Sequence, residues 1–230
     1  MEFRELTPEE LLGPLNEVET KHAPKKLFAA GDIDILRHAA RVSVVGSRKA
    51  SAAGICRAKR LSALLSSRGI VVVSGLADGI DTAAHQAALA ADGRTVAVLG
   101  TPLNETHPKN NAALQQRLMR EQLVVSQFPS GIAVQRGNFL IRNRIMALIS
   151  DATVIIEAGD TSGSLSQGWE ALRLGRPLFI AKSSIDDASL AWPRQMLHYG
   201  AYVLSDETLD ELFALLPDRA LVELSSALPF

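Results

Sequence analysis

The stretch Val42-Ser43-Val44-Val45-Gly46-Ser47-Arg48 decides the fold, because a run typical of a buried strand leads directly into a tight, polar, cationic turn. A helical segment is expected to follow at about residues 51–67. In an open parallel α/β sheet, ligands bind at the carboxyl ends of such strands. A phosphate there would meet backbone N–H groups, the positive end of a helix dipole and an arginine. The stretch therefore predicts an anion site, with a phosphate as its ligand.

Apolar runs and helical patterns alternate along the rest of the chain. Short runs rich in β-branched residues predict strands at residues 42–45, 70–73, 95–99, 123–125, 153–156, 178–180 and 202–204. Helical segments are expected at about 51–67, 80–91, 109–121, 140–150, 164–175 and 189–198. Continuous apolar strands that alternate with helices are typical of a parallel sheet covered on both faces. The predicted fold class is therefore α/β: a single extended Rossmann-like, doubly wound domain with a mostly parallel sheet and helices on both faces.

Three segments are expected along the chain. Residues 1–40 form an N-terminal appendage, in which Thr7-Pro8-Glu9-Glu10 has the pattern of a helix N-cap and first turn and predicts one short helix. Residues 23–28 are expected to be an extended approach to the main domain. The Rossmann-like domain takes residues 41–216, and residues 217–230 form a C-terminal tail.

Positive charge is concentrated early in the predicted domain, although the whole chain of 230 residues has a net charge of −1. Seven basic residues and no acidic one lie between Arg41 and Ala77: Arg41, Arg48, Lys49, Arg57, Lys59, Arg60 and Arg68. A local excess of positive charge can attract polyanions even when the protein is nearly neutral. This distribution favours an anionic partner for the first part of the domain.

The sequence shows no targeting or membrane signal. Met1 is followed at once by Glu2, Arg4 and Glu5, which is unlike a signal peptide. No apolar run approaches the ~20 residues that a membrane span needs. The single cysteine, Cys56, excludes an internal disulfide and favours a reducing compartment. A soluble, cytoplasmic protein without a membrane partner is expected.

Four loops at expected strand ends are rich in small, polar and charged residues. Because ligand-binding loops of such a sheet lie at the carboxyl ends of its strands, these loops should converge. Glycines permit close backbone approach, serines and arginines donate to phosphate oxygens, and Phe139 offers a ring on which a base can stack. The predicted site residues are Gly46, Ser47, Arg48, Ser74, Gly75, Gly79, Asp81, Arg136, Phe139, Arg142, Asn143, Arg144, Ser162, Gly163 and Ser164.

Several residues also have a structural interpretation, which stays open at this point. Phe139 could belong to the core, and the arginines of Arg142-Asn143-Arg144 could pair with an acid such as Asp151. His85, one turn into an expected helix, fits a hydrogen-bonded interior histidine. Glu157, at an expected strand end, fits either a structural or a catalytic carboxylate.

Other chemistries lack their sequence signals. No Gly-x-Gly-x-x-Gly follows a strand and no Gly-x-x-x-x-Gly-Lys-Ser/Thr is present, which disfavours a dinucleotide cofactor and a P-loop ATPase. The five histidines and one cysteine show no zinc spacing. Ser162-Gly163-Ser164 is not the Gly-x-Ser-x-Gly of a nucleophile elbow. No catalytic residue, metal or cofactor is therefore assigned.

Taken in order, these motifs resemble the DprA/Smf family, the DNA-processing proteins of bacterial transformation. The resemblance covers about residues 24–204. It rests on Val45-Gly46-Ser47-Arg48, Ser74-Gly75-Leu76-Ala77-Asp78-Gly79-Ile80-Asp81 with Ala84-His85, His107-Pro108 with Asn110-Asn111, Phe139 with Arg142-Asn143-Arg144, and Glu157 with Ser162-Gly163-Ser164-Leu165. His107 stands where a tyrosine is usual in that family.

The resemblance implies an extended Rossmann fold that binds single-stranded DNA in a positive pocket and usually dimerises. Such proteins protect incoming strands and help to load the RecA recombinase. Carried over to this chain, Arg48 resembles a DNA-phosphate contact, Arg136 lies near a basic DNA contact, and Phe139 resembles the aromatic residue beside the strand. The loop from Gly75 to Asp81, with Arg142, Asn143 and Ser162 to Ser164, resembles the pocket wall.

The expected function is therefore a DNA-binding recombination mediator without enzymatic activity, with single-stranded DNA, RecA and a second copy of the chain as partners. Apolar residues around Trp192, Met196 and Leu197 are the expected dimer surface. Two alternatives come from the broader superfamily: a nucleotide-binding sensor, and a phosphoribohydrolase that cleaves the N-glycosidic bond of nucleoside monophosphates. In the hydrolase, Glu157 or Glu170 would be the catalytic carboxylate, although the signature Pro-Gly-Gly-x-Gly-Thr loop is absent.

Overall fold

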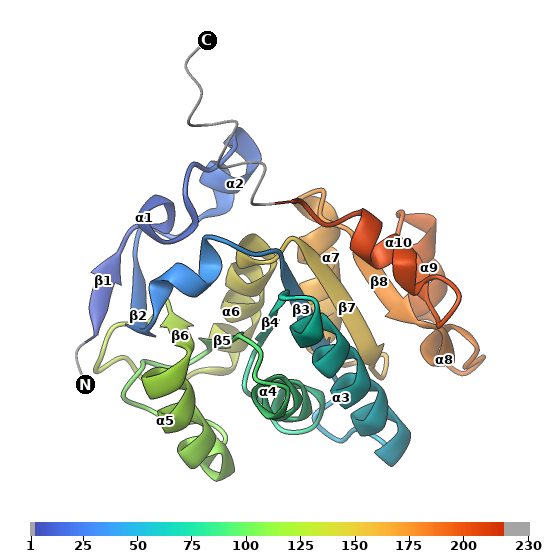
Figure 1. Cartoon of the computed structure of the whole chain (residues 1–230), viewed down its shortest axis with the longest axis horizontal. Helices are drawn as coiled ribbons and strands as arrows, with labels where there is room; N and C mark the ends of the chain where they lie inside the picture. Colours follow the sequence, from blue (N-terminus) through green and yellow to red (C-terminus); the bar gives the residue numbers. More distant parts are fainter. Residues whose placement is uncertain (1–2, 219–230) are drawn as a thin grey trace.

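A nine-stranded sheet forms the centre of the molecule (Figure 1). The computed structural model describes residues 3–218, so most of the expected C-terminal tail lies outside the described residues. The strands are β1 (Arg4–Leu6), β2 (Leu27–Gly31), β3 (Arg41–Gly46), β4 (Val71–Ser74), β5 (Thr95–Leu99), β6 (Leu123–Ser126), β7 (Ala152–Glu157), β8 (Leu178–Ala181) and β9 (Tyr202–Leu204). Their order across the sheet is β1-β2-β6-β5-β4-β3-β7-β8-β9. The strands from β3 to β9 are parallel, which confirms the predicted α/β fold class.

Helices cover both faces of this sheet (Figure 1). They are α1 (Pro8–Leu12), α2 (Glu17–His22), α3 (Ala52–Ser67), α4 (Ile80–Ala90), α5 (Ala112–Glu121), α6 (Arg136–Ile149), α7 (Ser164–Arg173), α8 (Lys182–Ile185), α9 (Trp192–His198) and α10 (Leu209–Ala214). Two 3-10 turns, η1 (Ile33–Leu36) and η2 (Lys109–Asn111), precede β3 and α5. Apolar residues of α1, α6, α7 and α9 pack in one core cluster, whereas those of α3, α4 and α10 pack in another. The strands from β3 to β8 are buried on both faces because each face has its own core.

The N-terminal segment is part of the sheet rather than only an approach to it. Strand β2 runs antiparallel to both β1 and β6, and its first residue, Leu27, is fully buried. The short helix expected after Thr7 is confirmed as α1, and Thr7 accepts a hydrogen bond from the N–H of Glu10. The extended segment expected at residues 23–28 thus ends in a paired strand, which the short Ala-rich sequence of β2 did not indicate. A domain boundary at residue 40 stays a prediction.

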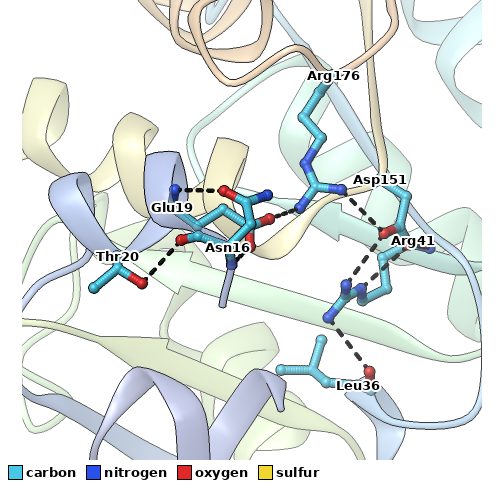
Figure 2. Close-up of polar contacts among 7 residues, drawn as sticks. All are labelled: Asn16, Glu19, Thr20, Leu36, Arg41, Asp151 and Arg176. Carbon is cyan, nitrogen blue, oxygen red and sulfur yellow. Dashed lines mark hydrogen bonds and ion pairs between the residues drawn. The ribbon is translucent and has the colours of Figure 1, made fainter. Parts of the chain in front are cut away.

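A buried ion-pair network connects the N-terminal segment to the amino ends of β3 and β7 (Figure 2). The Arg41 guanidinium lies 3.2 Å from Oδ1 of Asp151, and the Arg41 backbone N–H donates to Oδ2 at 2.8 Å. Arg176 pairs with Glu19 of α2 and lies 3.8 Å from Asp151. Burial raises the pKa of Asp151, and the charge of Arg41 opposes that rise. The proposed pairing of Asp151 with the arginines of residues 142–144 is not what the structure shows.

Candidate functional site

A cleft opens where the chain changes direction across the sheet. After β3, the chain builds β4, β5 and β6 on one side; it then returns through α6 and places β7 on the other side of β3 (Figure 1). Ligands of open α/β sheets bind outside the carboxyl ends of the strands at such a switch point. The cleft has a volume of about 820 Å³ and is lined by the loops after β3 and β7 and by the first turns of α6 and α7.

Most of the predicted site residues meet in this cleft. Its lining includes Gly46, Ser47, Arg48, Asp81, Arg136, Phe139, Arg142, Asn143, Ser162, Gly163 and Ser164. The lining also includes Lys49, His107, Gln135 and Thr161, which the predicted set did not contain. Lys49 directly follows Arg48 in the sequence, so its place in the cleft could have been predicted from that position. His107 comes from the loop after β5; its His107-Pro108 motif belonged to the family resemblance but was not assigned to the site.

Arg48, Phe139 and His107 form one mixed aromatic and cationic wall. The guanidinium carbon of Arg48 lies 5.2 Å from the centroid of the Phe139 ring. The centroid of the His107 ring also lies 5.2 Å from the Phe139 centroid, and the planes of these two rings are tilted relative to each other. Phe139 is half-buried, and a Cβ built on Gly100 would approach its ring within 2.6 Å. Phe139 therefore packs against the chain and also presents part of its ring in the cleft. Its two proposed roles, in the core and in base stacking, are compatible.

Two helix N-termini supply positive potential to the same cleft. The N-cap residues of α6 and α7 are Gln135 and Gly163, and neither makes a side-chain capping hydrogen bond. No acidic residue lies in the first turn of either helix. The N–H groups of a helix's first turn have no partner within the helix, and they carry the positive end of its dipole. Together with Arg48, Lys49 and Arg136, these helix ends make the cleft attractive to an anion.

A buried polar chain holds the loops of the cleft in place. Asp81, Arg142 and Asn143 are all at least nine-tenths buried. Arg142 donates to the carbonyl oxygens of Gly75 and Val98 and to Oδ1 of Asn143, whose amide donates to the Gly163 carbonyl at 2.9 Å. Burial raises the pKa of Asp81, while the charge of Arg142 opposes that rise. Arg142 and Asn143 thus link the loop after β4, strand β5 and the loop after β7, and most of their hydrogen-bonding capacity is used inside the protein.

The remaining predicted site residues do not line the cleft. Ser74 is buried and donates to the Val44 carbonyl at 2.7 Å. Gly75 has no room for a Cβ because the Arg142 guanidinium fills that space, and Gly79 has a φ of 77°. These three residues shape the loop behind the cleft. Arg144 lies on the exposed side of α6, pairs with Glu170 at 3.2 Å and does not line the cleft, so a contact with DNA at this residue stays a prediction.

The acid-free basic stretch is largely neutralised in three dimensions. Four of its seven bases pair with acids from distant parts of the chain: Arg41 with Asp151, Arg57 with Glu157, Arg60 with Asp206, and Arg68 with Asp210. Arg48 and Lys49 are exposed at the cleft, and no ion pair is found for either among residues 3–218. The positive potential therefore comes from the turn after β3 and not from the stretch as a whole.

The two glutamates of the hydrolase alternative are engaged elsewhere. Glu157 accepts hydrogen bonds from the backbone N–H and the hydroxyl of Ser51, at 2.8 and 2.5 Å, and so holds the start of α3. Glu170 pairs with Arg144 and Arg173. Within residues 3–218, no group of three or more His, Cys, Asp and Glu side chains could hold a metal ion, and no helix is long and apolar enough to cross a membrane.

His85 is an interior histidine, as one interpretation of the sequence predicted. It is fully buried in α4, and its Nδ1 lies 2.7 Å from the Thr95 hydroxyl. Because that hydroxyl donates to the Val72 carbonyl at 2.8 Å, Nδ1 must be the donor to Thr95. Burial lowers the pKa of His85 to about 3, so the ring is neutral at physiological pH.

Comparison with known proteins places the chain in a family. The family model for DNA recombination-mediator protein A matches residues 7–216. The chain belongs to this family. Among curated relatives, the DNA processing protein DprA of Bacillus subtilis (strain 168) is 31% identical over 196 residues, which are 85% of this chain and 65% of the relative. The chain spans about half to two thirds of the length of several curated DprA and Smf relatives that it matches.

Solved structures of DNA processing protein A share the fold. The protein from Streptococcus pneumoniae is 33% identical with a TM-score of 0.78, and the match covers 91% of this chain and 74% of that one. The protein from Helicobacter pylori is 25% identical with a TM-score of 0.79, and the match covers 94% of this chain and 97% of that one. The latter structure was described for its single-stranded DNA binding mode.

Proposed function

We propose that this DprA family member binds single-stranded DNA in the cleft at the switch point, with little sequence preference. One observation carries the proposal: exposed cations, an aromatic ring and two helix N-termini converge on a cleft whose single acidic lining residue, Asp81, is buried next to Arg142. Phosphates would bind the cations and the N–H groups. Phe139 would give a base a surface for stacking, which tolerates any base because every base has a π face.

The distribution of the cations supports a polymer rather than a single phosphate. Arg48 and Lys49 follow β3, whereas Arg136 begins α6 after the long loop that follows β6. One phosphate needs a single cradle, but successive phosphates along a strand need cations on several loops. The lining of the cleft fits this requirement, because it comes from the turn after β3, the first turn of α6 and the loop after β7.

Fluorescence anisotropy with a labelled oligo-dT strand tests the proposal. Phosphate contacts release counterions, so the affinity should fall steeply as the salt concentration rises. Single strands should bind more tightly than a duplex of the same length, because only unpaired bases can stack on Phe139. An absence of binding at low salt, or an equal affinity for duplex DNA, would contradict the proposal.

We also propose binding without chemical turnover. The observation behind this is that Glu157 and Glu170, the two carboxylates of the hydrolase alternative, already have partners within the chain. The test follows thermal stability and free base together after adding either oligo-dT or nucleoside monophosphates. A ligand at 100 times its dissociation constant stabilises by about 2.7 kcal/mol, so oligo-dT should raise the melting temperature and release no base. Free base that disappears in Glu157→Gln or Glu170→Gln would favour the hydrolase, and stabilisation by a mononucleotide alone would favour a sensor.

Loading of RecA onto the bound strand is proposed as the cellular role. Support comes from membership of a recombination-mediator family. The test is the rate at which RecA assembles on single-stranded DNA that is coated with single-strand-binding protein. This chain should accelerate assembly, and a cleft variant such as Arg48→Ala should do so less. Equal rates with and without the chain would limit the proposal to strand binding.

A homodimer is also proposed, but on a different surface from the expected one. Trp192 and Met196 are buried in the chain's own core, so they are not available for a partner. The neighbouring surface carries Trp169 and Tyr199, exposed by 37% and 67%, with ring centroids 5.4 Å apart. Light scattering at micromolar concentration should show a dimer that Trp169→Lys dissociates. A wild-type mass of 24.7 kDa would contradict the dimer.

A further inference from the structure

Three glycines have no explanation within the chain itself. Nearly every glycine has either a left-handed backbone angle or a neighbouring atom that a Cβ would crowd. Gly137, Gly159 and Gly163 have neither: an added Cβ would meet nothing within 4 Å, and no left-handed φ is found. Backbone geometry and packing within residues 3–218 therefore do not require glycine at these positions.

All three glycines border the cleft. Gly159 and Gly163 line it directly. Gly137 is the second residue of α6, next to Arg136 in the lining. Glycine inside a helix lowers the stability of that helix relative to alanine, whereas it lets a ligand approach the main chain closely. A ligand that passes over the main chain at these three points accounts for the absence of side chains there.

A second hollow lies beside the cleft and continues it. Its volume is about 350 Å³, and Ser47, Lys49 and Gly159 line both hollows. The far wall of the second hollow comes from α8 and the loop after it, with Ser183 and Asp187 among its residues. Gly159 thus stands on the border between the two hollows, at a point where a side chain would narrow the passage.

The second hollow differs from the cleft in charge. Its Arg57 pairs with Glu157 at 3.7 Å, and Asp187 accepts hydrogen bonds from the N–H and hydroxyl of Ser189 at 2.9 and 2.6 Å. Lys49, on the border, is the remaining cation of its lining. A nearly neutral hollow with hydroxyl and carboxylate groups suits a base and a sugar, while a cation at its entrance suits the phosphate that links them to the strand.

We propose that a single strand bound in the cleft continues over Gly159 into the second hollow, which holds one further nucleotide. This inference rests on the proposed function and extends it by one subsite. The linking phosphate lies against Lys49, and the nucleoside lies between Ser183 and Asp187. The subsite makes the affinity depend on strand length, because only a strand long enough to cross Gly159 occupies it.

The experiment measures the affinity for oligo-dT strands that lengthen by one nucleotide at a time. Gly159→Val puts a branched side chain on the border, where its Cβ has no atom of the chain within 4 Å. Ser183→Glu adds bulk and negative charge to the far wall only. Lys59→Ala and Ala91→Val are matched controls, since both residues are exposed and line neither hollow. Melting temperatures of all four variants show whether the fold is intact.

The wild type should gain affinity by on the order of tenfold at one particular length step, as expected for one added base and phosphate. Gly159→Val and Ser183→Glu should both lose that step, while both controls keep it. Ser183→Glu, whose residue lies outside the cleft lining, should still bind shorter strands like the wild type. Retention of the step in both variants would overturn the second subsite. Equal weakening at every length in Ser183→Glu would also overturn it, because that variant would then act on the cleft itself and not on a separate subsite. A wild type that binds no strand of any length would instead contradict the proposed function.

Discussion

Arg48→Ala should remove a phosphate contact from the cleft and leave the fold intact. Arg48 is exposed, and its guanidinium carbon lies 5.2 Å from the centroid of the Phe139 ring. A hydrogen bond to a charged group contributes about 1.5–3 kcal/mol, and about 1.4 kcal/mol corresponds to a tenfold change in affinity. The variant should therefore bind oligo-dT about 10- to 100-fold more weakly than the wild type.

The stability of the Arg48→Ala variant should change little. An exposed cation–π contact contributes about 0.5–1 kcal/mol, and for a chain of this length about 1 kcal/mol corresponds to a shift of about 2–4 °C in melting temperature. A much larger drop would mean that Arg48 supports the fold, and the affinity loss would then say nothing about a phosphate contact. Arg48→Lys keeps the charge but loses the planar fork, so its affinity should lie between those of the wild type and Arg48→Ala.

Anisotropy titrations over a series of salt concentrations measure both the affinity and the number of phosphate contacts. Losing one contact should reduce the slope of log affinity against log salt by about 0.7 for a single strand. Lys59→Ala is the matched control, because Lys59 is an exposed base of α3 outside the cleft lining and should keep the wild-type slope. A folded Arg48→Ala variant with wild-type affinity and wild-type slope would refute the assignment of Arg48 to the site.

Three further substitutions have defined outcomes. Phe139→Ala should weaken strand binding by about 1–3 kcal/mol through lost stacking, whereas Phe139→Trp should retain binding. Anisotropy titrations measure both affinities, and an equal loss of affinity in the two variants would contradict a stacking role for Phe139. Asp151→Asn leaves the buried Arg41 without its counter-charge and should lower the free energy of unfolding by about 3–5 kcal/mol, measured by urea unfolding; a loss below about 1 kcal/mol would be typical of a surface pair instead. Burial lowers the pKa of His85 to about 3. As the pH falls, the unfolded chain therefore binds a proton at His85 at a higher pH than the folded protein does. The wild type should then lose up to about 1.4 kcal/mol per pH unit as the pH falls from about 6.5 towards 3; a His85→Gln variant with the same pH dependence would contradict this.

The fold could be predicted largely because its central strands are apolar on both faces. Such strands leave an uninterrupted signal, and all seven strands predicted from residue 42 onward are present. Strands β1 and β2 lack that signal: β1 has three residues with an exposed pattern, and β2 contains Ala29, Ala30 and Gly31. Strand β1 pairs with β2, and β2 pairs with β6, which lies almost a hundred residues away in the chain. No local propensity encodes that long-range pairing.

The candidate site could be located from the sequence, but the roles of its residues could not be assigned. Topology alone brings the loops after parallel strands to one edge, so the convergence of Ser47 and Ser162 was predictable. Burial separates Arg48, which is exposed in the cleft, from Arg142, which bonds to internal carbonyl groups. Arg60 was counted as a free cation because its partner, Asp206, lies far along the chain. A sequence shows how charges are spaced along the chain, but it does not show which opposite charges lie beside them in the folded protein.

The central claim is that single-stranded DNA lies in the cleft at the carboxyl ends of β3 and β7. Photo-crosslinking of a bromodeoxyuridine-substituted strand, followed by mass spectrometry of the crosslinked peptides, tests it most directly. Crosslinks should fall on the peptide with Phe139 and on the turn with Arg48, and high salt should abolish them together with binding. Crosslinks confined to other surfaces, such as α5 or α10, with the cleft peptides unmodified, would contradict the claim.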